Sequence, residues 1–248
     1  MMTETLILVP TPGEYSVLQP KLQSLLQTDE HGQAANRMEV CGFGPVSAAA
    51  RTAYLIVQLQ PKQILLTGIA GALDRDLSPG HAYAFHQVAV YGIGAGSGDT
   101  FLNAGELGWP HWSSRRADGS EFRINDQIDL RHNASQTSDE SETLDAQPDD
   151  AVVESQRDVA DQCDDRLLLT VCAAAATQKE VRDRLAKFPT AAAEDMEAFS
   201  VALAARMAGV PLDIVRGISN IAGDRDKRRW RIVDALYSAA DLILSTEF

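Results

Sequence analysis

Residues 194–230 read EDMEAFSVALAARMAGVPLDIVRGISNIAGDRDKRRW, and this stretch decides the predicted fold. Asp-Met-Glu at 195–197 is expected to open a helix, and Leu-Asp-Ile-Val at 212–215 is expected to form a strand. Arg-Gly-Ile-Ser-Asn at 216–220 ends that strand with polar side chains. Open α/β sheets bind ligands at the carboxyl ends of their strands, so this stretch predicts a ligand site as well as a fold.

The N-terminal part of the chain alternates strands and helices. Residues 6–9, 37–41 and 63–67 read as strands, each followed by a turn that contains glycine or proline. Helices are expected over residues 14–27 and 46–59. This alternation predicts an α/β fold of three layers, with helices on both faces of a mixed, largely parallel central sheet.

The middle of the chain contains a segment of different composition. Residues 83–91 and 167–172 are expected to form strands, and the glycine-rich residues 92–98 a loop. Residues 133–165 hold eleven acidic residues and one basic residue, with few large apolar side chains. Such a segment has little surface to bury, so we expect an acidic, mobile insertion within a single domain that spans residues 1–248.

The composition argues against several classes of partner. A net charge of −13 disfavours binding to nucleic acid or to an anionic membrane surface. There is no run of about 18 apolar residues and no basic leader, so neither a membrane span nor a signal peptide is expected. Cys41, Cys163 and Cys172 give an odd count, which favours reduced thiols in a cytoplasm. Neither these cysteines nor the five histidines have metal-ligand spacing, so no metal is expected.

Glu197 is the first candidate for chemistry. Met196, Phe199, Leu203 and Met207 recur at helical spacing and are expected to face the core, with Glu197 beside them in the first turn. The helix dipole favours a carboxylate there, so we expect Glu197 to be ionised. An ionised carboxylate only accepts hydrogen bonds, and it can hold both the 2′ and the 3′ hydroxyl of a ribose. The alternative is a glutamate that merely stabilises the start of the helix.

Asn220 is the second candidate, at the carboxyl end of the predicted strand. Its NH2 group offers two donors, which match the N7 and O6 acceptors of hypoxanthine, whereas adenine presents an acceptor and a donor. Such donors also stabilise negative charge on a departing base, and a comparable preorganised donor contributes about 3–4 kcal/mol. A turned amide pairs with adenine too, and an asparagine that ends a strand in a turn is common.

These motifs resemble those of the purine nucleoside phosphorylase/hydrolase superfamily. Ser-Asn at 219–220 in place of Ser-Asp, followed by Gly-Asp-Arg-Asp at 223–226 and Trp230, is similar to its futalosine hydrolase branch. In the superfamily the methionine of the Met-Glu pair at 196–197 packs on the sugar and the glutamate holds its hydroxyls. The resemblance covers most of the chain outside 133–165. It implies a three-layer αβα nucleoside phosphorylase/hydrolase fold, a small-molecule nucleoside substrate, no cofactor and a homo-oligomer.

The resemblance also gives Glu14 a role. Hydrolases of the superfamily place a glutamate after the first strand, where it orients and deprotonates the attacking water. Phosphorylases need arginines at that point for phosphate, and the loop at 10–14 has none, which favours hydrolysis. Taken alone, a glutamate at this position is equally well explained as a residue that stabilises the first turn of a helix.

Further candidates for substrate contact are glycines and an arginine. Gly68 and Gly71 lie in TGIAGA at 67–72, which looks like a family motif whose backbone approaches the sugar or the water, although glycine after a strand often marks only a turn. CAAAAT at 172–177 falls where the family's base-facing loop lies, or it starts the next helix. Arg225 either pairs with the benzoate of futalosine or joins a surface network with aspartates.

The sequence therefore predicts an N-glycosyl hydrolase. The resemblance implies that it converts futalosine to dehypoxanthine futalosine and hypoxanthine in menaquinone biosynthesis. Three alternatives stay open at this point. They are a methylthioadenosine/adenosylhomocysteine-type nucleosidase, a purine nucleoside phosphorylase and a nucleoside-binding protein without turnover.

Overall fold

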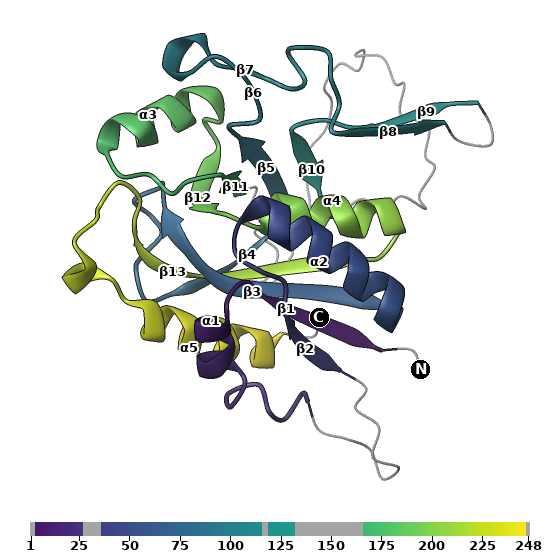
Figure 1. The fold of residues 1–248 in the computed structure, drawn as a ribbon. Helices are drawn as coiled ribbons and strands as arrows, with labels where there is room; N and C mark the ends of the chain where they lie inside the picture. Colours follow the sequence, from purple (N-terminus) through teal and green to yellow (C-terminus); the bar gives the residue numbers. More distant parts are fainter. Residues whose placement is uncertain (1–2, 27–35, 116–118, 132–165, 247–248) are drawn as a thin grey trace, which may run out of the picture.

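The computed structural model describes residues 3–26, 36–115, 119–131 and 166–246. In this part of the chain nine strands form one sheet, and helices lie on both of its faces (Figure 1). The strands of the sheet are β1 (Thr5–Val9), β2 (Arg37–Val40), β3 (Gln63–Ala72), β4 (Ala82–Phe85), β5 (Gln87–Tyr91), β10 (Gln127–Asp129), β11 (Leu167–Val171), β12 (Ala191–Asp195) and β13 (Leu212–Ile221). The helices are α1 (Pro12–Leu18), α2 (Gly44–Leu59), α3 (Gln178–Lys187), α4 (Ala198–Ala208) and α5 (Ile232–Ser245).

Two short hairpins lie outside this sheet. They pair β6 (Gly94–Ala95) with β7 (Leu102–Asn103) and β8 (Trp112–Arg115) with β9 (Glu121–Ile124). The acidic segment at 133–165 lies outside the described residues. No helix in the described ranges has the length and apolar character needed to cross a membrane.

The main sheet is mixed but largely parallel. Its strand order is β10-β5-β11-β12-β3-β1-β2, and β13 pairs with both β3 and β4. The pairs β1–β2, β1–β3, β3–β13, β5–β11 and β11–β12 are parallel. The pairs β4–β13, β3–β12 and β5–β10 are antiparallel. The predicted three-layer fold with a mixed, largely parallel sheet is confirmed.

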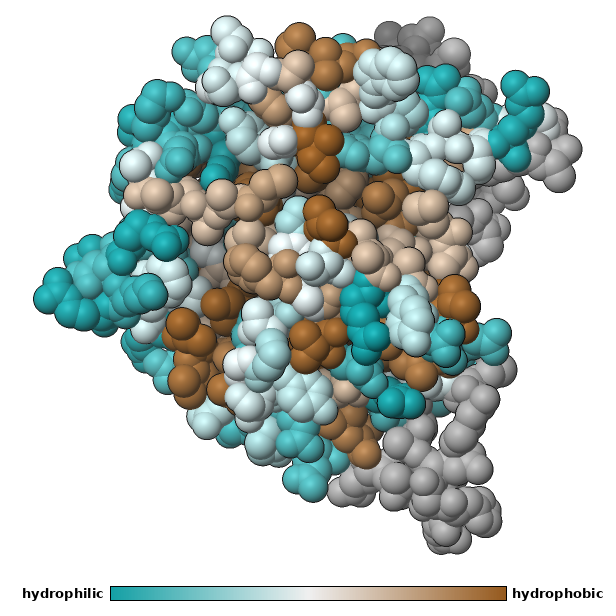
Figure 2. All heavy atoms as spheres, in the orientation of Figure 1, coloured by the Kyte–Doolittle hydropathy of each residue, from teal (hydrophilic) through white to brown (hydrophobic). Residues whose placement is uncertain are grey.

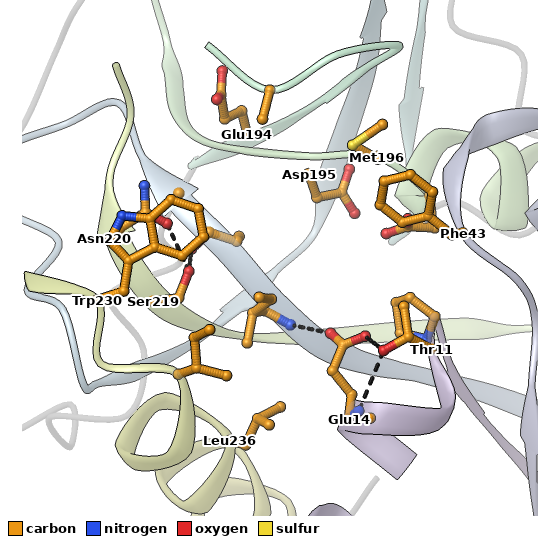
Figure 3. Close-up of a pocket in the computed structure, with 18 of the residues that line it drawn as sticks. Thr11, Glu14, Phe43, Glu194, Asp195, Met196, Ser219, Asn220, Trp230 and Leu236 are labelled. Carbon is orange, nitrogen blue, oxygen red and sulfur yellow. Dashed lines mark hydrogen bonds between the residues drawn. The ribbon is translucent and has the colours of Figure 1, made fainter. Parts of the chain in front are cut away.

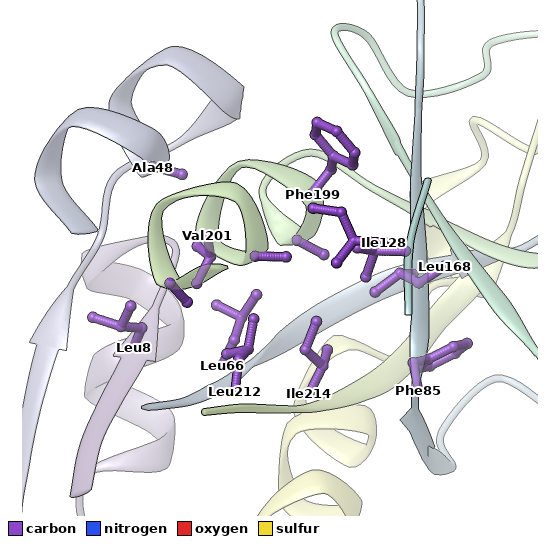
Figure 4. Packing of buried hydrophobic residues seen from close by; sticks show 14 of the residues in the cluster. Leu8, Ala48, Leu66, Phe85, Ile128, Leu168, Phe199, Val201, Leu212 and Ile214 are labelled. Atoms are coloured by element: carbon purple, nitrogen blue, oxygen red, sulfur yellow. The ribbon is translucent and has the colours of Figure 1, made fainter. Parts of the chain in front are cut away.

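The core lies on both faces of the sheet, which is why the strands are apolar along their whole length. On one face, Leu8, Leu66 and Ile214 pack with Ala48 of α2 and Val201 of α4 (Figure 4). On the other face, α1 and α5 cover a second cluster of apolar side chains. Burial of each large side chain contributes about 1.5–3 kcal/mol, so the two layers of helices hold the strand ends in fixed positions.

Several predicted boundaries are wrong, for local reasons. Helix α1 ends at Leu18 rather than near 27, because Pro20 has no backbone N–H to donate to the Ser16 carbonyl and so interrupts the helical hydrogen bonds. Strand β3 does not stop at Gly68 but continues to Ala72, since β13 pairs alongside it. The strand predicted at 83–91 divides at His86 into β4 and β5, which pair with different neighbours. The predicted loop at 92–98 contains the short strand β6.

The segment around residue 195 also differs from expectation. Strand β12, which the sequence did not reveal, ends at Asp195, and α4 begins at Ala198 rather than at 195. Asp195 caps the helix instead, because its Oδ2 accepts a hydrogen bond from the Ala198 N–H at 2.9 Å. Met207 was expected in the core, but it is 49% exposed. It lines an apolar groove between α2 and α4, within the apolar band across the middle of the face in Figure 2.

Candidate active site

A cavity of about 560 Å³ lies at the carboxyl ends of the parallel strands. Its walls come from segments that are distant in sequence: the turn after β1, the ends of β3, β11, β12 and β13, and the start of α5 (Figure 3). Six of the seven predicted site residues line it, namely Glu14, Gly71, Met196, Glu197, Asn220 and Arg225. Gly68 is not among the lining residues that the structure describes.

Glu14 is held in the first turn of α1. Thr11 is the N-cap of that helix, and its hydroxyl donates to Glu14 Oε2 at 2.6 Å (Figure 3). The backbone N–H of Ile69 donates to Oε1 at 3.0 Å. The carboxylate is 8% exposed and faces the cavity. Two fixed donors therefore orient it, and its remaining lone pairs are available to a water or a substrate.

Gly68 leaves room for two charged side chains beside β3. Its φ is +146°, and a Cβ there would lie 2.5 Å from Arg216 Nη1 and 2.7 Å from Glu14 Oε1. Both contacts are far shorter than a real Cβ tolerates. The glycine therefore lets the carboxylate of Glu14 and the guanidinium of Arg216 approach the same point of β3.

Arg216 is the buried cation of the site. It lies in β13 with 0% exposure, and its Nη2 donates to Asp195 Oδ2 at 2.5 Å and to Glu197 Oε2 at 3.4 Å. Its Nη1 donates to the Thr67 carbonyl at 3.1 Å. Although burial disfavours the charge, Asp195, Glu197 and Glu14 raise the pKa of Arg216. The guanidinium therefore stays charged and fixes the carboxylates around it.

Glu197 is held from two sides. Its Oε1 accepts a hydrogen bond from the Gly44 N–H at 3.0 Å, which links the glycine turn after β2 to the start of α4. Its Oε2 faces Arg216. Each oxygen keeps a second lone pair, so a pair of neighbouring hydroxyls can bind without breaking these contacts. Met196 lies beside it on the cavity wall (Figure 3).

The charge state of Glu197 differs from the sequence-based expectation. Burial raises the pKa of Glu197 to about 7, with Asp195 and Glu14 also raising it and Arg216 lowering it. The helix dipole was expected to keep this group fully ionised, but desolvation outweighs it because the side chain is 4% exposed. Near neutral pH the group therefore carries a proton for part of the time.

Asn220 is oriented by its neighbours. The Ser219 hydroxyl donates to Asn220 Oδ1 at 2.7 Å, which directs the NH2 group away from that oxygen. One of its two N–H bonds is used on the Ile221 carbonyl at 2.9 Å. One donor, rather than the two expected from the sequence, is left for a ligand in the cavity.

Part of the cavity wall is apolar. Val17, Ile232 and Leu236 form this wall together with Trp230. Arg225 stands at its edge, with its Cζ 5.6 Å from the centre of the Trp230 ring. The aspartates nearby pair with other arginines. Asp224 binds Arg229 and Asp226 binds Arg228, in a network at the surface.

The loop at 172–177 forms another part of the wall. Ala174 and Ala175 line the cavity, and α3 begins only after Thr177, which is its N-cap. The small side chains therefore belong to a loop at the cavity wall, as one of the two expectations had it. Within the described residues no three His, Cys, Asp or Glu side chains are arranged to hold a metal ion.

Three charged residues of the site were given no role from the sequence. Asp195 lies at the end of an alanine-rich strand that was not predicted, and Glu194 precedes it. Arg216 was seen only as part of a polar strand end. An arginine directly after Ile214 and Val215 was the available signal, because a charge inside a buried strand needs a partner.

Comparison with known proteins identifies the family. Residues 30–244 match the family model described as "Phosphorylase superfamily". The chain belongs to the phosphorylase superfamily. A curated futalosine hydrolase of Streptomyces coelicolor is 28% identical over 207 residues, which cover 82% of this chain and 74% of the relative. A futalosine hydrolase of Acidothermus cellulolyticus is 42% identical over 69 residues, 28% of each chain. The resemblance expected from the sequence, including its futalosine hydrolase branch, is confirmed.

Solved structures share the fold. The futalosine hydrolase of Helicobacter pylori superposes with a TM-score of 0.65 at 17% identity, covering 99% of this chain and 97% of that one. A methylthioadenosine/adenosylhomocysteine nucleosidase of Colwellia psychrerythraea, solved with adenine, gives 0.63 at 20% identity, covering 98% and 94%. These relatives and neighbours are nucleosidases, which supports the predicted enzyme class, an N-glycosyl hydrolase.

Proposed function

We propose that this phosphorylase-superfamily protein hydrolyses the N-glycosidic bond of futalosine. The products are hypoxanthine and dehypoxanthine futalosine, in menaquinone biosynthesis. The observation that carries the proposal is the convergence of Glu14, Glu197 and Asn220 on one cavity of about 560 Å³. The activity named for the curated relatives supports the choice of substrate.

Glu197 and Met196 bind the sugar in this proposal. The free lone pairs of Glu197 accept the 2′ and 3′ hydroxyls of the ribose, and Met196 packs against the ring. Electron density drawn toward the ring stabilises the oxocarbenium ion that forms as the base departs. Because burial raises the pKa of Glu197 to about 7, the form that accepts both hydroxyls is the deprotonated one, populated above neutrality.

Asn220 and Glu14 act on the two groups that exchange at the anomeric carbon. The bond between C1′ and N9 breaks with its electron pair moving to the base. The free N–H of Asn220 donates to the acceptor edge of the hypoxanthine, a contribution of about 3–4 kcal/mol for a preorganised donor. A water attacks C1′ from the side of Glu14, which accepts its proton, and the hypoxanthine anion takes a proton from solvent.

The charges in the cavity support hydrolysis over phosphorolysis. Glu14, Glu194, Asp195 and Glu197 all line it. Among the described lining residues Arg225 is the single Arg or Lys, and it lies next to the Trp230 ring. A phosphate anion would meet several carboxylates and no cluster of cations, so water is the better nucleophile here.

The apolar part of the wall supports a substrate with a group beyond the sugar. Val17, Trp230, Ile232 and Leu236 suit an aromatic or alkyl substituent at the 5′ position, and Arg225 suits the benzoate of futalosine. A methylthio group would also fit such a wall. A methylthioadenosine/adenosylhomocysteine nucleosidase is therefore the second candidate, since neighbours with this fold carry that name. The amide of Asn220 favours the hypoxanthine base of futalosine.

The groove between α2 and α4 supports assembly into a homo-oligomer. Val46 is 83% exposed, Val57 73% and Met207 49%, an exposure of apolar surface that a second copy of the chain would bury (Figure 2). We also propose a cytoplasmic location, which agrees with the free thiols of Cys41 and Cys172.

Chromatography for free hypoxanthine after incubation with futalosine in phosphate-free buffer tests the proposal. We expect release of hypoxanthine without added phosphate. Parallel incubations with methylthioadenosine, and with inosine plus phosphate, identify the alternatives. If adenine is released from methylthioadenosine faster than hypoxanthine from futalosine, methylthioadenosine is the substrate instead. A strict need for phosphate would contradict hydrolysis.

A further inference from the structure

Asp195 is a buried carboxylate that is held from three sides. It lines the cavity and is 5% exposed (Figure 3). Its Oδ1 accepts a hydrogen bond from the Thr170 hydroxyl at 2.7 Å, and its Oδ2 accepts from the Ala198 N–H at 2.9 Å and from Arg216. The Thr170 hydroxyl in turn accepts from the Phe199 N–H at 2.8 Å, so its one proton is free to point at Asp195. Asp195 is therefore fixed to β11 and to the start of α4 independently of Arg216.

Arg216 lies unequally between two carboxylates. Its Nη2 is 2.5 Å from Asp195 Oδ2 but 3.4 Å from Glu197 Oε2. Charge-assisted N–H···O hydrogen bonds are usually about 2.7–2.9 Å long, so the contact with Glu197 is a weak one. Nη1 is bound to the Thr67 carbonyl at 3.1 Å, which holds the other side of the guanidinium. Arg216 is therefore mainly the partner of Asp195.

This arrangement leaves Glu197 with little compensation. The charged or ionisable groups that act on it come from four elements, namely Asp195 of β12, Arg216 of β13, Glu14 of α1 and Cys41 after β2. Burial raises the pKa of Cys41 to about 12, so this thiol is neutral. Arg216 is the single cation in this set, and its closest contact is with Asp195. Glu197 therefore keeps lone pairs that no cation occupies.

We infer that Asp195 is a positioning residue that draws the Arg216 guanidinium away from Glu197 and so leaves the Glu197 carboxylate open to the two hydroxyls of a ribose. An arginine fork binds a free carboxylate through two parallel N–H bonds. Such a pairing with Glu197 would occupy the lone pairs that the hydroxyls require. Asp195 prevents it by binding Nη2 from a fixed position. The inference rests on the proposed function, because the sugar is assigned to Glu197 there.

A direct titration of Glu197 tests this role without a substrate. The protein is labelled with ¹³C at the side-chain carboxyl of glutamate, and the Glu197 signal is assigned by its absence from the spectrum of Glu197→Gln. The wild-type midpoint is expected at about 7. In Asp195→Asn it is expected to fall by at least about one pH unit, because Arg216 moves to Glu197 and a neighbouring negative charge is lost. Asp195→Ser is the second variant, since Asn and Ser both keep a cap acceptor for the Ala198 N–H.

Arg216→Met separates positioning from the direct effect of the charge on Asp195. If Asp195 acts through Arg216, Asp195→Asn shifts the Glu197 midpoint less in the Arg216→Met background than in the wild-type background. Equal shifts in the two backgrounds would show that the charge of Asp195 acts on Glu197 directly. That result overturns the inference, and so does an unchanged midpoint in folded Asp195→Asn or Asp195→Ser.

The rate of futalosine hydrolysis gives a second measurement. The acid limb of kcat/KM is expected to move to lower pH in Asp195→Asn together with the Glu197 midpoint, because the pKa of Glu197 is lowered. Well above neutral pH, kcat/KM is expected to fall by about 10- to 100-fold, the range for lost hydrogen bonds to a charged group. A general structural defect would lower the rate at every pH without moving the limb.

Asp183→Asn is the matched control, because it removes an aspartate charge from a surface pair with Lys179. Its Glu197 midpoint and its pH profile are expected to equal those of the wild type. Absence of futalosine hydrolysis by the wild-type protein would overturn the proposed function. The titration of Glu197 in the Asp195 and Arg216 variants would still decide the role of Asp195.

Discussion

Replacing Glu14 with glutamine removes its capacity to accept a proton while preserving its surroundings. In the wild-type protein the Ile69 N–H lies 3.0 Å from Glu14 Oε1, and the Thr11 hydroxyl lies 2.6 Å from Oε2. In the variant the amide oxygen takes the place of Oε1 and still accepts the Ile69 N–H, and the NH2 group takes the place of Oε2. That hydroxyl can rotate to accept instead of donate. The substitution therefore tests proton transfer with little change in packing.

The expected loss is in kcat, with KM within about twofold of wild type, because Glu14 acts on the water in the proposed mechanism and Glu197 binds the sugar. A positioned general base contributes about 10²- to 10⁴-fold, which corresponds to roughly 2.7–5.5 kcal/mol of activation free energy. A second effect follows from the electrostatics. The charge of Glu14 raises the pKa of Glu197, so Glu14→Gln lowers that pKa from its value of about 7. The acid limb of the residual activity is expected to move to lower pH.

Initial rates of hypoxanthine release from futalosine, over a pH series that spans neutrality, measure both effects. Glu4→Gln is the control, because Glu4 is a surface carboxylate paired with Lys62 and its removal is expected to leave the rate unchanged. A Glu14→Gln variant that retains more than about a tenth of the wild-type kcat would refute the role of Glu14 as the base.

Four further outcomes are expected. Gly68→Ala is expected to lower the stability by about 1–3 kcal/mol, because the φ of Gly68 is +146° and the new Cβ would meet two charged groups. Gly13→Ala is the control, because a Cβ there makes only an ordinary contact. Thermal unfolding of the two variants measures the difference. The kcat/KM of the wild-type protein rises with pH through about 7 as Glu197 loses its proton, and a flat profile would contradict its role. Arg225→Met is expected to raise KM for futalosine by about two- to fivefold, the loss in affinity that removal of an exposed ion pair causes. KM for inosine, which has no benzoate, is expected to stay unchanged. Met207→Glu shifts the protein to monomer in size-exclusion chromatography, and an unchanged elution volume would show that the α2–α4 groove is not the interface.

Much of the fold was predictable because its strands are buried on both faces. The run at 6–9 is apolar at each position, and a parallel sheet covered by two layers of helices requires this. Strand β12 escaped prediction because Ala191, Ala192 and Ala193 have a low preference for strands. Pairing with β11 and β3 holds this segment in the sheet, and neither partner is visible in the local sequence.

The sequence predicted the positions of several residues that line the cavity. Glu14, Glu197 and Asn220 each follow or precede a recognisable element, so their convergence followed from the topology. The pKa of Glu197 was not predictable, because it depends on Asp195 and on the burial of a side chain at the end of an unpredicted strand. The single free donor of Asn220 depends on the hydroxyl of its neighbour Ser219, which local sequence does not orient.

Arg216 belongs both to the core of the fold and to the candidate site. This one fully buried side chain contacts β3 through the Thr67 carbonyl, the end of β12 through Asp195, and the start of α4 through Glu197. Leaving a buried charge without its partner costs about 3–5 kcal/mol, a large part of the stability of a typical domain. The buried carboxylates of Asp195 and Glu197 and the buried guanidinium of Arg216 therefore compensate one another. Folding of the sheet edge and the charge state of Glu197 depend on one set of contacts.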